Sequence, residues 1–221
     1  MRPDARIVGV DNDPIVLAHA RAHGEEPAPS GATIVAGDVR RPAEILENPE
    51  VRGRLDFDRP VAVLLVAVMH FVIDEDDPYG AVRTLMDAVA PGSALVLSQV
   101  TADRDPAGVR ATAKAYARSS VKTAVRSGKE IAAFFDRLEP VDPGLVMLSQ
   151  WRPDEQVLAG DDGIGMYGGV AHMTRWREPL GAGGRRAYIL CTSTEKPLAR
   201  RLLRCSACAP SHCSMGTGSV R

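Results

Sequence analysis

Two acidic residues that could bind a ligand each follow a short apolar run. Asp11 comes directly after Ile7–Val10, and Asp38 follows Ala32–Ala36 across one glycine. A carboxylate there can accept two hydrogen bonds from a ribose diol, and crevices at the carboxyl ends of parallel strands are where nucleotide-like ligands bind. Asp11 could equally cap its turn, and Asp38 could be a cap or a solvated turn acid. The local pattern leaves these interpretations open.

A histidine and a run of acids follow the longest apolar run, Val61–Met69. His70 could be a general base that removes a proton from a substrate hydroxyl or amine, because an unperturbed imidazole titrates near neutral pH. The alternative, a packed histidine at a strand end, is the one we favour. The acids Asp74–Asp77 lack the spacing of a calcium loop. They suit the N-terminus of a helix that begins at Pro78.

The end of the chain differs from the rest. From His172 onward there are nine Lys and Arg residues against two Asp and Glu, whereas the preceding part has 18 against 26. Cys205, Cys208, His212 and Cys213 crowd into one short segment, whereas structural zinc sites usually have two separated pairs. We therefore expect a disordered basic tail over residues 172–221, with no metal site. The tail has no aromatic interleaving, so we expect no nucleic-acid binding.

Composition indicates a globular protein. Of 221 residues, 45% are hydrophobic and 25% are charged, with a net charge of −1. The N-terminus has no apolar signal region, and the longest apolar run is far shorter than the roughly 20 residues that span a bilayer. No cysteine falls in the main body, so nothing indicates an oxidised, secreted fold. We expect a cytoplasmic protein that does not enter membranes.

Strand and helix patterns alternate along the chain, which is typical of a mostly parallel α/β sheet with helices on both faces. The expected strands are Arg6–Val10, Ala32–Ala36, Val61–Met69, Ala94–Ser98, Leu138–Val141, Leu145–Trp151 and Gly165–Ala171. The expected helices are Pro14–Ala22, Pro42–Leu46, Tyr79–Val89, Ala107–Arg118 and Ile131–Phe135, the last one started by a capping box of Ser127 and Glu130. Residues 50–59 are expected to be irregular.

Several of these stretches together resemble a family of S-adenosylmethionine-dependent methyltransferases whose substrate is generally unassigned. The matching pieces are Pro3–Pro14, Ala36–Arg40, Arg59–Tyr79, Ser127–Phe135, Pro143–Asp154 and Tyr167–Val170. The first and third pieces are long and specific.

The resemblance implies a Rossmann-like methyltransferase sheet, mostly parallel with an antiparallel last strand, and S-adenosylmethionine as the methyl donor. It implies that Asp11, with Asn12 beside it, holds the ribose hydroxyls. It also implies that Asp38 meets the exocyclic amine of adenine, with the Val39 backbone near the ring. His70 would lie where the substrate side begins.

Two departures from the family concern the ends of the chain. Relatives begin earlier, with a strand that ends in a Gly-rich turn around the methionine part of the donor, whereas Met1 here falls just before the second strand. The missing strand would lie between the strands that end at Asp11 and Met69, so we expect two central strands without a partner. The match ends at Ala171. We therefore expect a partial, truncated methyltransferase domain over residues 1–171, incomplete at its N-terminus.

Three functions follow from these observations. The first is methyl transfer from S-adenosylmethionine to a small-molecule acceptor. The second is a non-catalytic remnant that pairs with another chain, since the Gly-rich turn is missing; a homo-oligomer also stays open. The third is an NAD(P)-dependent oxidoreductase fragment, because Asp11 also suits the ribose of NAD. Asp38 and the run Val61–Tyr79 favour the methyltransferase.

Overall fold

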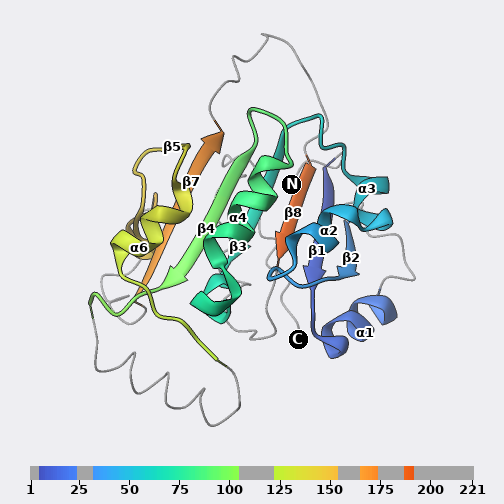
Figure 1. Cartoon of the computed structure of the whole chain (residues 1–221), viewed down its shortest axis with the longest axis horizontal. Coiled ribbons are helices and arrows are strands. Elements are labelled where there is room, and N and C mark those ends of the chain that lie inside the picture. The colour runs from blue at the N-terminus through green and yellow to red at the C-terminus, as the bar shows by residue number, and fades with distance from the viewer. Residues whose placement is uncertain (1–4, 24–31, 105–121, 154–164, 174–186, 192–221) are drawn as a thin grey trace, which may run out of the picture.

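The computed structural model describes residues 5–23, 32–104, 122–153, 165–173 and 187–191. These residues form an eight-stranded sheet in the order β2-β1-β8-β3-β4-β7-β5, with β6 paired to β7 (Figure 1). The strands are β1 (Arg6–Asp11), β2 (Ala32–Ala36), β3 (Val61–Val66), β4 (Ala94–Val100), β5 (Leu138–Pro140), β6 (Val146–Met147), β7 (Met166–Met173) and β8 (Ala187–Cys191).

The strand directions confirm the predicted fold class. The strands β2, β1, β8, β3 and β4 run parallel to their neighbours, and β7 runs antiparallel to β4. In Figure 1 the arrowhead of β7 therefore points opposite to that of β4. The core is mainly apolar, and its strand residues Val63, Leu65 and Leu95 are fully buried. The expected strand Val61–Met69 ends earlier, at Val66, because Ala67 has a positive φ of 56° that breaks the extended conformation, and a 3-10 turn begins at Met69.

The helices are α1 (Pro14–His23), α2 (Pro42–Glu47), α3 (Pro49–Arg54), α4 (Pro78–Asp87) and α6 (Gly128–Ala132), with 3-10 turns η1 (Met69–Phe71), η2 (Asp74–Asp76), η3 (Ala133–Phe135) and η4 (Leu148–Gln150). Figure 1 shows α2, α3 and α4 over one face of the sheet. The caps at Asp77 and Ser127 form as predicted. None of the helices in the described ranges has the length and apolar character of a membrane span.

One helix was not predicted. We expected residues 50–59 to be irregular, but α3 occupies the first part of this segment. The pair Asn48 and Pro49 ends α2 and also starts α3, because the Asn48 side chain accepts a hydrogen bond from the Glu50 amide at 2.8 Å. Asparagine as a cap and proline at the first position form a standard helix start. The predicted helix over 107–118 lies outside the described residues.

The strand β8 overturns the expectation of a gap in the sheet. It lies between β1 and β3 and is parallel to both, with Ile189 in register with Val8 on one side and Val63 on the other. Five residues from the segment that we expected to be a tail therefore supply the central strand, and β7 itself continues to Met173, past the expected boundary. Residues 174–186 and 192–221, with the cysteine-rich segment, lie outside the described part.

Candidate functional site

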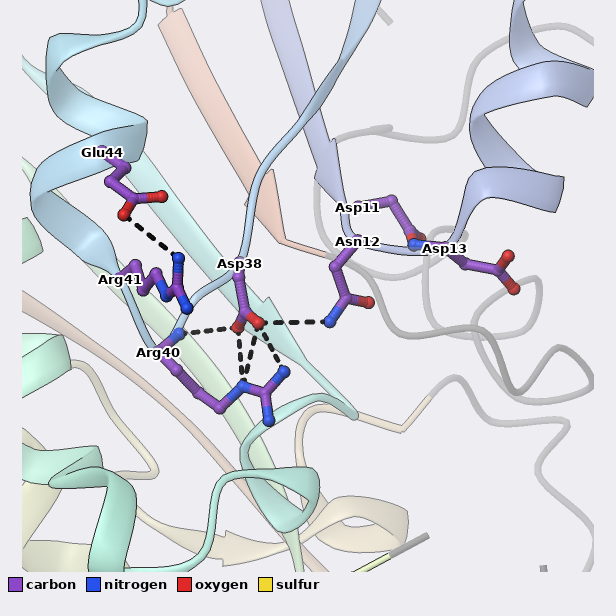
Figure 2. Close-up of polar contacts among 7 residues, drawn as sticks. All are labelled: Asp11, Asn12, Asp13, Asp38, Arg40, Arg41 and Glu44. Carbon is purple, nitrogen blue, oxygen red and sulfur yellow. Dashed lines mark hydrogen bonds and ion pairs between the residues drawn. The ribbon is translucent and has the colours of Figure 1, made fainter. Parts of the chain in front are cut away.

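The first predicted acid lies at the carboxyl end of β1, beside the end of β2. Asp11 is in register with Ala36, and the Gly37 amide donates a hydrogen bond to the Asp11 carbonyl at 3.1 Å. The two strands therefore end side by side, and their following turns start together. This brings Asn12 and Asp38 face to face, as Figure 2 shows.

Asp38 is the centre of a small polar network. The Asn12 Nδ2 donates to its Oδ2 at 3.4 Å, and the backbone N and Nε of Arg40 donate to its Oδ1 at 3.0 and 2.9 Å. Burial alone would raise the pKa of Asp38, but the hydrogen bonds and charge of Arg40 outweigh it and hold that pKa below its usual value. The Asp38 carboxylate is therefore ionised at neutral pH. Val39 beside it is buried in the core.

Asp11 has the geometry of a turn cap. Its side chain is 2% exposed, and its Oδ1 accepts a hydrogen bond from the Asp13 amide at 2.8 Å. Asp13 in turn accepts from the Ile15 amide at 2.7 Å, which starts α1. In Figure 2 the Asp11 carboxylate accordingly points toward its own turn. The sequence left capping and ligand contact open, and capping is the role that these bonds display.

The end of β8 completes the row of strand ends. Cys191 is in register with Val10 of β1 and Leu65 of β3. Burial raises the pKa of the Cys191 thiol to about 12, and the negative charges of Asp11 and Asp38 add to the effect.

His70 lies in η1, just past the end of β3, with its Nδ1 buried and unpaired among the described residues. Burial, and then the charge of Arg126, lower the pKa of His70 to about 4. The imidazole is therefore neutral at pH 7. An imidazole with so low a pKa holds a proton weakly, which favours the packed histidine over the general base.

One buried cation near His70 was not predicted from the sequence. Arg126 is 3% exposed and donates hydrogen bonds to the Met69 and Val72 carbonyls at 3.1 and 2.8 Å and to the Asp74 carboxylate at 2.6 Å. It thereby fixes the loop after β3. The only signal in the sequence is an arginine next to the Ser127 cap, and its acceptors lie more than fifty residues earlier.

The parallel sheet with an antiparallel last strand, and the acids at neighbouring strand ends, define a Rossmann-like methyltransferase fold. The family described as S-adenosyl methyltransferase matches residues 1–174, and the chain belongs to this family. S-adenosylmethionine is the family's methyl donor. The family match favours this donor over the nicotinamide alternative.

Solved structures agree with this assignment. The chain is 40% identical to a DUF574 family protein from Streptomyces avermitilis, with a TM-score of 0.72 over 77% of this chain and 66% of that one. It is 33% identical to a candidate methyltransferase from Thermobifida fusca YX, with a TM-score of 0.70 over 78% and 65%. The chain thus spans slightly less than two thirds of these relatives. No curated protein matches the sequence.

A more distant structure supports the fold alone. An S-adenosylmethionine-dependent methyltransferase from Mesorhizobium loti is 18% identical, with a TM-score of 0.52 over 76% of this chain and 80% of that one.

The polar residues at the ends of β1 and β2 are of a kind that suits the adenosine part of the donor. Ribose hydroxyls and the adenine amine are hydrogen-bond donors, and Asn12 and Asp38 offer acceptor oxygens at adjacent strand ends, next to the buried Asp11. The Arg40 side chain lies over Asp38 but is 44% exposed. An incoming adenine amine would therefore compete with the Arg40 guanidinium for the Asp38 oxygens.

Proposed function

We propose that the chain binds S-adenosylmethionine at the carboxyl ends of β1 and β2 and transfers its methyl group to a small molecule. The observation that carries this proposal is that Asn12 and Asp38 lie next to each other and share a hydrogen bond. Asn12 directly follows β1, which ends at Asp11, and Asp38 lies just past the neighbouring β2. In this proposal Asp11 and Asn12 receive the ribose hydroxyls. Asp38 receives the adenine amine, and the Val39 backbone lies beside the ring.

The chain's own contribution is positioning. When bound, the sulfonium donor supplies a methyl carbon, which moves to an acceptor oxygen or nitrogen as the carbon–sulfur bond breaks and the acceptor proton passes to solvent. An in-line displacement depends on alignment more than on acid–base help. The neutral His70 therefore serves as part of the acceptor side, and no proton transfer to it is needed.

The alternative of a non-catalytic remnant was based on the missing Gly-rich turn and included pairing with another chain. The central strands need no partner chain, because β8 pairs with both of them. A cytoplasmic location and a small-molecule acceptor remain parts of the proposal.

Isothermal titration calorimetry of the full chain with S-adenosylmethionine tests the donor site. A charge-assisted hydrogen bond contributes about 1.5–3 kcal/mol, so Asp38→Asn should weaken binding by roughly tenfold or more. Asp56→Asn is the control, because Asp56 is also a turn acid that accepts a backbone hydrogen bond two residues on, but it lies near the amino end of β1 and not at the carboxyl ends of β1 and β2. No measurable binding by the folded wild type rejects the proposal.

A further inference from the structure

Three unpaired polar atoms are gathered at the carboxyl ends of β3 and β4. Among the described residues, the buried side-chain atoms without a hydrogen-bond partner are His70 Nδ1, Gln99 Oε1, Arg126 Nε and Trp151 Nε1. The first three belong to one network. The Ala124 amide donates to the His70 carbonyl at 2.8 Å, the Ala124 carbonyl accepts from Gln99 Nε2 at 2.9 Å, and Arg126 follows two residues later.

The orientation of Gln99 is fixed. Its side chain is fully buried, and its amide nitrogen must face the Ala124 carbonyl, because that carbonyl can only accept. The Oε1 therefore cannot turn away without breaking this bond. Leaving a buried acceptor unpaired costs about 1–3 kcal/mol, and most buried polar groups are paired. A fixed acceptor of this kind can take one further hydrogen bond, which a ligand hydroxyl or N–H group could donate.

The position of this network shows at which edge of the sheet a ligand would reach it. Gln99 lies in the last part of β4, and His70 follows β3. Because β1, β2, β3 and β4 run in the same direction, both residues lie at the edge of the sheet where Asp11 and Asp38 lie. Ligands of open α/β sheets bind at this edge. In the strand order, β8 and β3 lie between β1 and β4, so this network is next to the proposed adenosine site along the same edge of the sheet and does not overlap it.

We propose that Gln99 and His70 form the subsite that binds the methyl acceptor, and that this subsite takes an uncharged hydroxyl or N–H group. This inference rests on the proposed methyl transfer. The Gln99 Oε1 accepts a hydrogen bond from the ligand, and the His70 Nδ1 offers a second polar contact. A cationic ligand is disfavoured, because the buried Arg126 guanidinium already places a positive charge at the Met69 carbonyl next to His70, and its ion-pair partner Asp74 is 80% exposed to screening solvent.

Two probes of the same shape test the charge preference. Benzyl alcohol presents a neutral hydroxyl, and benzylamine presents an ammonium group at pH 7. The imidazole signals of His70, assigned by comparison with His70→Gln, are followed by nuclear magnetic resonance in the full chain during titration with each probe. We expect benzyl alcohol to shift these signals and benzylamine to need at least a tenfold higher concentration. Equal responses, or no response to either probe, overturn the subsite.

A variant pair tests the role of Gln99. Gln99→Leu should abolish the response to benzyl alcohol, whereas Gln150→Leu, at an exposed glutamine, should keep it. A folded Gln99→Leu variant with the full response overturns the proposal. If Gln99→Leu does not fold, the wild-type comparison of the two probes decides alone.

Donor calorimetry separates this inference from the proposed function. Donor binding without any His70 response overturns only the subsite. A selective response to benzyl alcohol without donor binding supports a hydroxyl site and rejects methyl transfer.

Discussion

Truncating the centre of β8 should destabilise the protein strongly. Ile189 is fully buried and lies in register with Val8 and Val63, which are also fully buried. Ile189→Ala removes three carbons, worth about 0.8 kcal/mol each in transfer free energy, and leaves a cavity in the core that covers this face of the sheet. We therefore expect a loss of about 3–4 kcal/mol, within the range of about 2–5 kcal/mol for such substitutions. A domain has only about 5–15 kcal/mol of stability.

Urea unfolding followed by circular dichroism measures this loss in the full chain. The matched control is Ile15→Ala, because Ile15 undergoes the same chemical change but is 76% exposed on α1. An exposed truncation of this kind changes the free energy of unfolding by about 0.5 kcal/mol or less. The comparison is valid if both variants keep the wild-type dependence on urea concentration.

Equal stability of the two variants would refute this reasoning. It would mean that Ile189 is not packed in the core, and that β1 and β3 are not separated by β8. The expectation of a gap in the sheet would then stand.

Two further predictions concern charged and titrating groups. Arg40→Ala should raise the pKa of Asp38, since burial then acts without the opposing arginine, and should tighten donor binding severalfold by calorimetry, whereas Arg41→Ala should not. The pKa of His70 is about 4, below the ordinary 6.5, so as the pH falls the imidazole is protonated in the unfolded chain before it is protonated in the folded chain. Stability should therefore fall as pH drops from about 6.5 to about 4, by about 3 kcal/mol in total. Urea unfolding at pH 7, 5 and 4 should show this loss, reduced in His70→Gln and unchanged for the exposed His172→Gln.

The parts of the fold that were predicted correctly depend on neighbours in sequence. The capping box at Ser127 and the cap at Asp77 close hydrogen bonds within three residues, so the residue types suffice to predict them. The strand β2 follows from a short apolar run between polar turns. The adjacency of Asp11 and Asp38 follows once both strands are taken as parallel neighbours.

The parts that were missed depend on distant partners. The β8 segment is a short apolar run, but its partners, β1 and β3, lie far earlier in the chain, and no local pattern specifies them. Arg126 likewise looks like one arginine among many, because its acceptors Met69, Val72 and Asp74 lie in another loop. Periodicity describes which face of an element is buried, but it does not identify what covers that face.

The position of β8 also sets the width of the proposed site. Neighbouring strands are about 4.8 Å apart, so β8 keeps the ends of β1 and β3 about two spacings apart. Without it, Asp11 and the loop of His70 would come closer by about one spacing. A displacement of about 1 Å between reacting groups can already cost about a hundredfold in rate. A central strand is therefore required for the geometry between the donor and acceptor sides, wherever in the chain that strand originates.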